Sequence, residues 1–124
     1  MLVVLDTNVI VSALLSPHGK PAYIFNRFIS GELTLCVDER ILSEYYAVLS
    51  RPKFKFDNQY VDVIMSFIRA HALIISPLPI NVSFQDESDK KFYEVAKFCN
   101  ATLITGNLKH FPIDNTVKSV NEMF

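Results

Sequence analysis

Residues 1–10 read Met-Leu-Val-Val-Leu-Asp-Thr-Asn-Val-Ile, and this stretch decides the fold. The apolar, partly β-branched run at 2–5 is too short for a lone helix, which predicts a strand buried on both faces. The run ends in Asp6, at the place where open α/β sheets bind their ligands. Asp6 is equally suited to capping a helix that begins near Val9, so this stretch alone leaves both roles open.

The composition predicts one folded domain over residues 1–124. Half of the residues are hydrophobic and only 20% are charged, which excludes a disordered chain. A net charge of -1 argues against binding nucleic acid through bulk positive charge, but leaves a local basic patch open. Cys36 and Cys99 lie among apolar neighbours, so we expect two buried thiols in a reducing compartment. Since no signal-peptide pattern or membrane-spanning run is evident, we expect a cytoplasmic protein with no membrane contact.

Apolar segments of strand length alternate with amphipathic segments along the rest of the chain. Beyond the first strand, the pattern predicts strands at 33–37, 73–75, 102–105 and 117–120, and helices at 8–15, 21–30, 39–50, 58–72 and 88–100. Five strands that alternate with helices predict an α/β fold with a parallel, doubly wound sheet.

Helical spacing places two further carboxylates on inward faces. Glu44 shares the edge of a face formed by Ile41, Tyr45 and Val48, and Asp89 falls one turn before Phe92. A carboxylate beside an apolar stripe needs a cation, a hydrogen-bond partner or a cleft. The same spacing directs Ile29, Tyr60 and His71 inward, and Glu39, Lys90, Lys91, Glu94 and Lys97 toward water.

Asp6, Glu44 and Asp89 therefore come from three separate elements that end or begin at the same edge of the sheet. Like charges held together repel, so such a cluster implies a divalent cation, and oxygen ligands favour Mg²⁺ or Mn²⁺ over zinc. Such an ion can activate water and neutralise charge on a phosphodiester. Thr105 and Asn107 follow the strand at 102–105 and bring a hydroxyl and an amide to this edge, with Asp86 as a further acid at its rim.

Simpler roles remain open for several of these residues. Asp38 is expected to be only a helix cap, and Asp86 is equally suited to capping the next helix. Glu44 could pair with Arg40 or Arg51. The alternating basic and aromatic residues at 51–56 suit a solvated connector with aromatic anchors better than a nucleic-acid track.

Four segments taken together resemble a PIN domain. They read VVLDTNVIVSALL (3–15), ILSEYYAVLSRPKF (41–54), DESDKKFYEVAKF (86–98) and ATLITGNLKHFP (101–112). The chain most resembles the VapC-like branch, the toxins of toxin-antitoxin systems. This resemblance implies a three-layer α/β/α fold around a parallel sheet of about five strands, and a Mg²⁺- or Mn²⁺-dependent endoribonuclease. It also implies an RNA substrate, an antitoxin partner and a homodimer.

The resemblance carries residue roles onto matching positions. Asp6, Glu44 and Asp89 match the three acids that hold the metal, while Asn107 stands where many PIN domains have a fourth aspartate. With asparagine there, the pocket loses one negative charge and should hold a second ion less tightly. Thr7, Asn8, Asp86 and Thr105 are expected to support the site, and Arg51, Lys53, Lys55 and Lys109 to contact the RNA backbone.

Two other classes of protein are compatible with parts of this pattern. The Asn107 replacement and the modest basic charge suit a non-catalytic PIN-like module that binds RNA or a protein. A phosphotransfer receiver domain also places an acid at a strand end. It needs an acidic pair there, and Asp6 stands alone, so this class ranks last.

Overall fold

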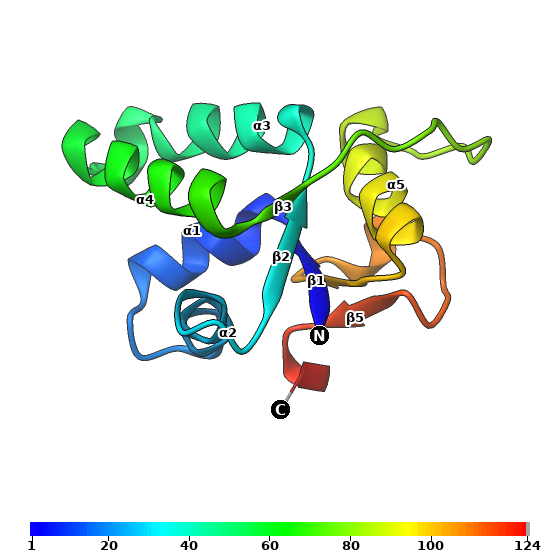
Figure 1. Cartoon of the computed structure of the whole chain (residues 1–124), viewed down its shortest axis with the longest axis horizontal. Coiled ribbons are helices and arrows are strands. Elements are labelled where there is room, and N and C mark those ends of the chain that lie inside the picture. The colour runs from blue at the N-terminus through cyan, green and yellow to red at the C-terminus, as the bar shows by residue number, and fades with distance from the viewer. Residues whose placement is uncertain (124) are drawn as a thin grey trace.

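Parallel strands form one sheet within residues 1–123, the part of the chain that the computed structural model describes (Figure 1). The spatial order is β3-β2-β1-β4-β5, and each neighbouring pair runs parallel. The strands are β1 (Leu2–Leu5), β2 (Thr34–Val37), β3 (Leu73–Ile74), β4 (Thr102–Thr105) and β5 (Val117–Ser119). With helices on both faces, the predicted three-layer α/β/α fold is confirmed. The last residue of the expected 1–124 domain lies outside the described residues.

The helices also lie where the hydrophobic pattern places them. They are α1 (Thr7–Leu15), α2 (Lys20–Ile29), α3 (Glu39–Leu49), α4 (Asn58–His71) and α5 (Lys90–Cys99). Short 3₁₀ turns are η1 (Pro52–Phe54), η2 (Glu87–Asp89), η3 (Leu108–His110) and η4 (Asn121–Met123). The ends differ from the predicted ones by one or two residues, the main change being that η2 precedes α5.

The strand order reverses beside β1. The chain moves outward from β1 to β2 and β3, and then returns through α5 to β4 on the other side of β1. In this arrangement α5 packs across β1, β2 and β4. Val3, Val4 and Leu5 are fully buried, as expected for a strand covered on both faces. The carboxyl ends of β1 and β4 therefore form the switch point, where open α/β sheets bind ligands.

Two helix ends are fixed by single residues, and the predicted helix cap at Asp38 is one of them. Asp38 caps α3, because its Oδ1 accepts a hydrogen bond of 2.9 Å from the Ile41 N–H. Gly31 follows α2 at φ +88°, a conformation that a side chain would strain.

Cys36 is buried, and burial raises the pKa of its thiol to about 12. Cys99 is half-buried rather than buried, and both thiols are free.

Several side chains face differently from the prediction. Ile29 and Tyr60 are each 44% exposed, because they flank a shallow groove of about 160 Å³ instead of closing it. His71 is exposed at the end of α4 and packs its ring on Phe67, at 4.3 Å between centroids. Glu94 was expected in water but is 4% exposed, since the loop after β3 crosses over α5 there and the Ile80 N–H donates to it. Within residues 1–123 no helix has the length and apolar character needed to span a bilayer.

Candidate active site

Asp6 lies at the carboxyl end of β1, between that strand and α1, and is 6% exposed. It occupies the N-cap position of α1, where the backbone N–H groups of Thr7 and Asn8 act on its carboxylate, but no full side-chain capping hydrogen bond forms. Instead, the Thr105 hydroxyl donates to Asp6 Oδ2 at 2.8 Å across the switch point. Burial raises the pKa of Asp6, and the negative charge of Glu44 raises it further against the opposing effect of Thr105.

A buried tyrosine fixes the strand end that carries Asp6. The Tyr45 hydroxyl, on α3, donates to the Leu5 carbonyl at 2.5 Å, and Tyr45 has no exposed surface. Burial raises the pKa of Tyr45 well above its ordinary value, so the hydroxyl stays a donor. Helical spacing predicted that Tyr45 is buried, but it gave no sign of this hydrogen bond, which joins residues 40 positions apart.

Glu44 reaches the same place from the middle of α3. Its Oε2 accepts a hydrogen bond from the Thr7 hydroxyl, and its Oε1 lies 2.7 Å from Lys91 Nζ. The expected alternatives, pairing with Arg40 or Arg51, are wrong. Arg40 instead binds Asp38 and Glu94, so Asp38 does more than cap α3. The expectation that Lys91 faces water is also wrong, because its side chain is only 11% exposed.

Asp89 ends η2 and precedes the first residue of α5, so it lies at the helix start rather than on its inward face. Its side chain is largely buried, and its Oδ2 lies 3.3 Å from His110 Nδ1. Burial raises the pKa of Asp89, and the charge of Asp6 raises it further. His110 was not singled out from the sequence. The available signal was its position in η3, which follows β4 at the same edge of the sheet.

Among the residues predicted to act beside the acids, the two threonines are buried and the two asparagines are exposed. Thr105 is fully buried, and Thr7 is 3% exposed. Thr105 also accepts a hydrogen bond of 2.9 Å from the Asn107 backbone N–H, so the turn after β4 is tied to Asp6 through one hydroxyl. The side chains of Asn8 and Asn107 are exposed at this edge.

Asp86 acts as a cap and also lies at the rim. Its Oδ1 accepts hydrogen bonds from the Ser88 N–H at 2.9 Å and the Ser88 hydroxyl at 2.6 Å, which lower the pKa of Asp86. With Gln85, Asp89 and His110 it lines a cavity of about 290 Å³. Asp86 therefore caps η2, the turn that leads into α5, rather than α5 itself, and a role in the site stays a prediction.

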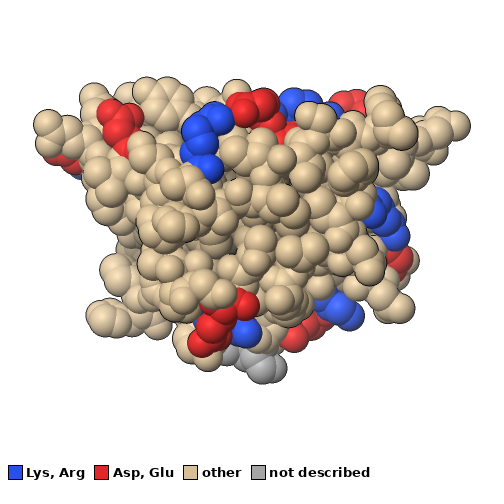
Figure 2. All heavy atoms as spheres, viewed as in Figure 1, with Lys and Arg blue, Asp and Glu red and all other residues tan. Residues whose placement is uncertain are grey.

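The four cations predicted to contact RNA do not lie together. Lys109 is in η3, next to His110. Arg51, Lys53 and Lys55 lie around η1 beyond the far end of α3, whose last residue is about 7.5 Å along the helix axis from Glu44 at roughly 1.5 Å per residue. Here the Phe54 and Phe56 rings stack at 6.0 Å and are partly buried, which fits a connector with aromatic anchors. In Figure 2 charged side chains gather at the margins of the face, with no continuous basic band across it.

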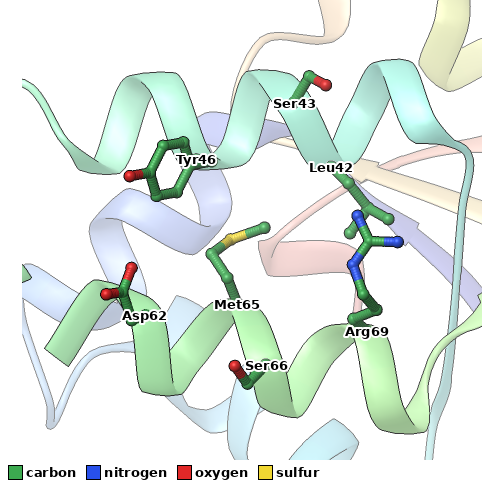
Figure 3. A pocket seen from close by; sticks show the side chains of 7 residues that line it. All are labelled: Leu42, Ser43, Tyr46, Asp62, Met65, Ser66 and Arg69. Carbon is green, nitrogen blue, oxygen red and sulfur yellow. The ribbon is translucent and has the colours of Figure 1, made fainter. Parts of the chain in front are cut away.

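A larger cavity of about 550 Å³ lies between α3 and α4, away from these carboxylates (Figure 3). It is lined by Leu42, Ser43, Tyr46, Asp62, Met65, Ser66 and Arg69. None of the residues predicted for the site lines this cavity, so the larger cavity volume does not mark the position of the carboxylates.

The donor set fits a hard divalent cation in its chemistry. Asp6 interacts electrostatically with Glu44 and Asp89, and all three side chains offer oxygen ligands. The arrangement is not a finished metal site: within residues 1–123 no group of three His, Cys, Asp or Glu side chains surrounds one position for an ion. Each of the three acids already has a partner: Thr105 donates to Asp6, Thr7 and Lys91 bind Glu44, and Asp89 lies 3.3 Å from His110.

Together, the fold and this edge define a small α/β protein with carboxylates gathered at the switch point of a parallel sheet. Residues 2–109 match the PIN domain family, and the chain belongs to this family, as its four segments predicted. It is 31% identical over 109 residues to an uncharacterized protein of Methanocaldococcus jannaschii, covering 85% of this chain and 70% of that protein. The structure of VapBC2 from Rickettsia felis, bound to a DNA fragment from its promoter, is similar with a TM-score of 0.62 and 21% identity over 96% of this chain and 98% of that one.

Proposed function

We propose that the chain is a Mg²⁺- or Mn²⁺-dependent endoribonuclease, acting as the toxin of a toxin-antitoxin pair. The observation that carries this proposal is the convergence of Asp6, Glu44 and Asp89 at the switch point of the sheet. These acids come from three elements and are linked through Thr7, Thr105 and their mutual electrostatic effects. Membership of the PIN domain family supports the same conclusion.

Each side chain then has a defined task. Asp6, Glu44 and Asp89 hold the cation, while Thr105 orients Asp6 and Thr7 orients Glu44. When bound, the cation supplies a Lewis acid that makes water a better nucleophile and offsets charge on the phosphodiester. Asn107 contributes its amide from the turn after β4, and hydrolysis leaves 5′-phosphate and 3′-hydroxyl ends.

The partners follow from the same proposal. We infer an antitoxin protein that acts with this chain, because the similar structure holds VapBC2 with promoter DNA. We also infer that the chain forms a homodimer and acts in the cytoplasm. Finding an adjacent gene for a small DNA-binding protein would support the antitoxin.

The test is RNA cleavage under controlled metal conditions. Single-stranded and structured RNAs are incubated with the chain in Mg²⁺, Mn²⁺ or EDTA, beside Asp6→Asn and the control Asp62→Asn, whose exposed carboxylate lies on α4. We expect cleavage by the unaltered chain and the control with metal only, and a loss of at least about a hundredfold for Asp6→Asn. Cleavage that survives EDTA, or equals that of the unaltered chain in Asp6→Asn, would reject this mechanism.

A non-catalytic PIN-like module is the second candidate. It is favoured by the lack of a finished three-ligand metal site within residues 1–123 and by asparagine at 107. Calorimetric titration with Mn²⁺ separates the two. Binding in the micromolar to low millimolar range favours the nuclease, and no binding at millimolar Mn²⁺ favours the module.

A further inference from the structure

Lys91 is a confined cation in the first turn of α5. Its Nζ lies 2.7 Å from Glu44 Oε1, it donates a hydrogen bond to the Ser88 carbonyl, and it lies 4.9 Å from the centre of the Phe92 ring. These partners come from α3, from η2 and from α5 itself. With 11% of its side chain exposed, Lys91 is not a solvated surface lysine.

The position of Lys91 is unfavourable for a cation without its partner. The N-terminal end of a helix carries partial positive charge, which repels an ammonium group. Removing an ammonium from water also costs free energy unless an opposite charge or several acceptors replace the water. Glu44, 47 residues earlier in the chain, is the carboxylate in direct contact that offsets both effects, and the charges of Asp86 and Asp89 act on Lys91 as well.

The ion pair also determines what Glu44 can do. Lys91 holds one carboxylate oxygen of Glu44, and the Thr7 hydroxyl holds the other. Asp6 and Asp89 remain as the acids whose charges interact at the switch point. Glu44 is thus held by other groups and Asp89 lies 3.3 Å from His110, and within residues 1–123 no three of these donors surround one position for an ion.

We propose that Lys91 is an internal counter-ion, which holds Glu44 in the metal-free protein and which a divalent cation must displace before Glu44 joins Asp6 and Asp89. This inference rests on the metal dependence of the proposed nuclease. The exchange is a side-chain movement, because the ammonium group sits on a flexible four-carbon stem. Lys91 thereby stabilises the acidic edge in the absence of a divalent cation and weakens metal binding at the same time.

The first measurement is Mn²⁺ affinity by calorimetry for the unaltered chain, Lys91→Gln and Lys90→Gln. Lys90 is the matched control, since it is the adjacent lysine in the same turn and carries the same charge. We expect Lys91→Gln to bind Mn²⁺ about tenfold more tightly, the size of effect typical of one partly buried ion pair. The effect of Lys90→Gln should be much smaller, because it changes only the more distant charge.

The second measurement is thermal unfolding, which does not depend on catalysis. In EDTA, Lys91→Gln should unfold at a lower temperature than Lys90→Gln, because Glu44 is left without its cation. That difference should disappear when both substitutions are made in a Glu44→Gln background. Saturating Mn²⁺ should raise the unfolding temperature of Lys91→Gln by more than that of the unaltered chain.

Each result separates this inference from the proposed function. Equal or weaker Mn²⁺ affinity in Lys91→Gln than in the unaltered chain overturns the counter-ion role and leaves the nuclease intact. Tighter binding without any RNA cleavage supports the counter-ion and rejects the nuclease. If none of the proteins binds Mn²⁺, both the displacement and the metal-dependent mechanism are wrong.

Discussion

Asp6 is a charged group held in a place that disfavours charge. Burial raises the pKa of Asp6, so the folded chain binds this proton more tightly than the unfolded chain does. Its contribution to stability is therefore fully present below the unfolded pKa and is lost as pH rises through the folded pKa. Asparagine keeps the side-chain oxygen that accepts from Thr105 and removes the charge.

We therefore expect Asp6→Asn to be more stable than the unaltered chain at pH 7 in EDTA, by roughly 1 kcal/mol. The difference should shrink toward pH 4, where the native carboxyl takes up its proton. Urea unfolding between pH 4 and pH 8 measures this, with the exposed Asp62→Asn as control. A loss of stability at neutral pH in Asp6→Asn would contradict the expected effect of the buried charge.

Tyr45 supports the site indirectly, because its hydroxyl donates to the Leu5 backbone carbonyl and not to one of the acids. Replacing it with phenylalanine removes the hydrogen bond to the Leu5 carbonyl in a fully buried position. We expect Tyr45→Phe to lose about 1 kcal/mol of stability. The neighbouring Tyr46 is 51% exposed, so Tyr46→Phe should change stability by less than about 0.5 kcal/mol in the same chemical denaturation experiment. Equal losses in the two variants would show that the hydrogen bond adds nothing.

Among the elements, α3 and α5 are joined by a network of one arginine and two acids. Arg40 contacts Asp38 at 2.6 Å and Glu94 at 2.9 Å, and the Ile80 N–H donates to Glu94 at 3.0 Å. Both acids are nearly buried, while half of the Arg40 side chain is exposed. The network fixes the start of α3, the loop after β3 and the middle of α5 relative to each other.

Removing Arg40 should leave Glu94 as an unpaired buried charge. We expect Arg40→Met to lose about 2–3 kcal/mol, somewhat less than for a fully buried pair because the arginine is partly solvated. Arg69→Met is the control, since Arg69 binds the exposed Glu39 and its loss should have a much smaller effect. If the two variants unfolded at the same temperature, the network would contribute no more than a surface pair.

The elements that could be predicted are those whose own residues decide their structure. The short continuous apolar run before Asp6 and the helical spacing of the apolar residues in α3 and α5 can each be recognised without knowledge of the rest of the fold. The prediction that Glu94 faces water is wrong. Helical spacing shows which side of α5 lacks apolar residues, but it does not show that the loop residue Ile80 lies over Glu94 on that side. Lys91 was misassigned because its partner Glu44 is on another helix, and His110 was missed because a short 3₁₀ turn has no period to read.

The same limit applies to the site as a whole. Asp6, Glu44 and Asp89 are predicted site residues from strand ends, helix faces and the PIN resemblance, and in the structure the charge of Asp6 interacts with Glu44 and with Asp89. The partners of the acids are set by contacts between distant segments. The pairing of Glu44 with Lys91 and of Asp89 with His110 could not be derived from spacing along the chain.

For the whole molecule, the proposed RNA substrate would have to approach an acidic edge on a chain with net charge -1. The phosphates can then be attracted only by cations placed close to that edge. Lys109 is next to His110, which contacts Asp89, whereas Lys53 lies in η1 beyond the end of α3. The two lysines are both exposed and carry the same charge, so they form a matched pair for tracing the RNA path.

We expect Lys109→Gln to weaken RNA binding uniformly across sequences and to reduce the slope of log affinity against log salt by about 0.7, the value for one phosphate contact on single-stranded RNA. Lys53→Gln should leave the slope unchanged. Binding is measured in an Asp6→Asn background, where cleavage is removed and the RNA stays intact. The reverse outcome, with the slope sensitive to Lys53 and not to Lys109, would place the RNA over η1 and away from the carboxylates, and it would separate binding from the proposed chemistry.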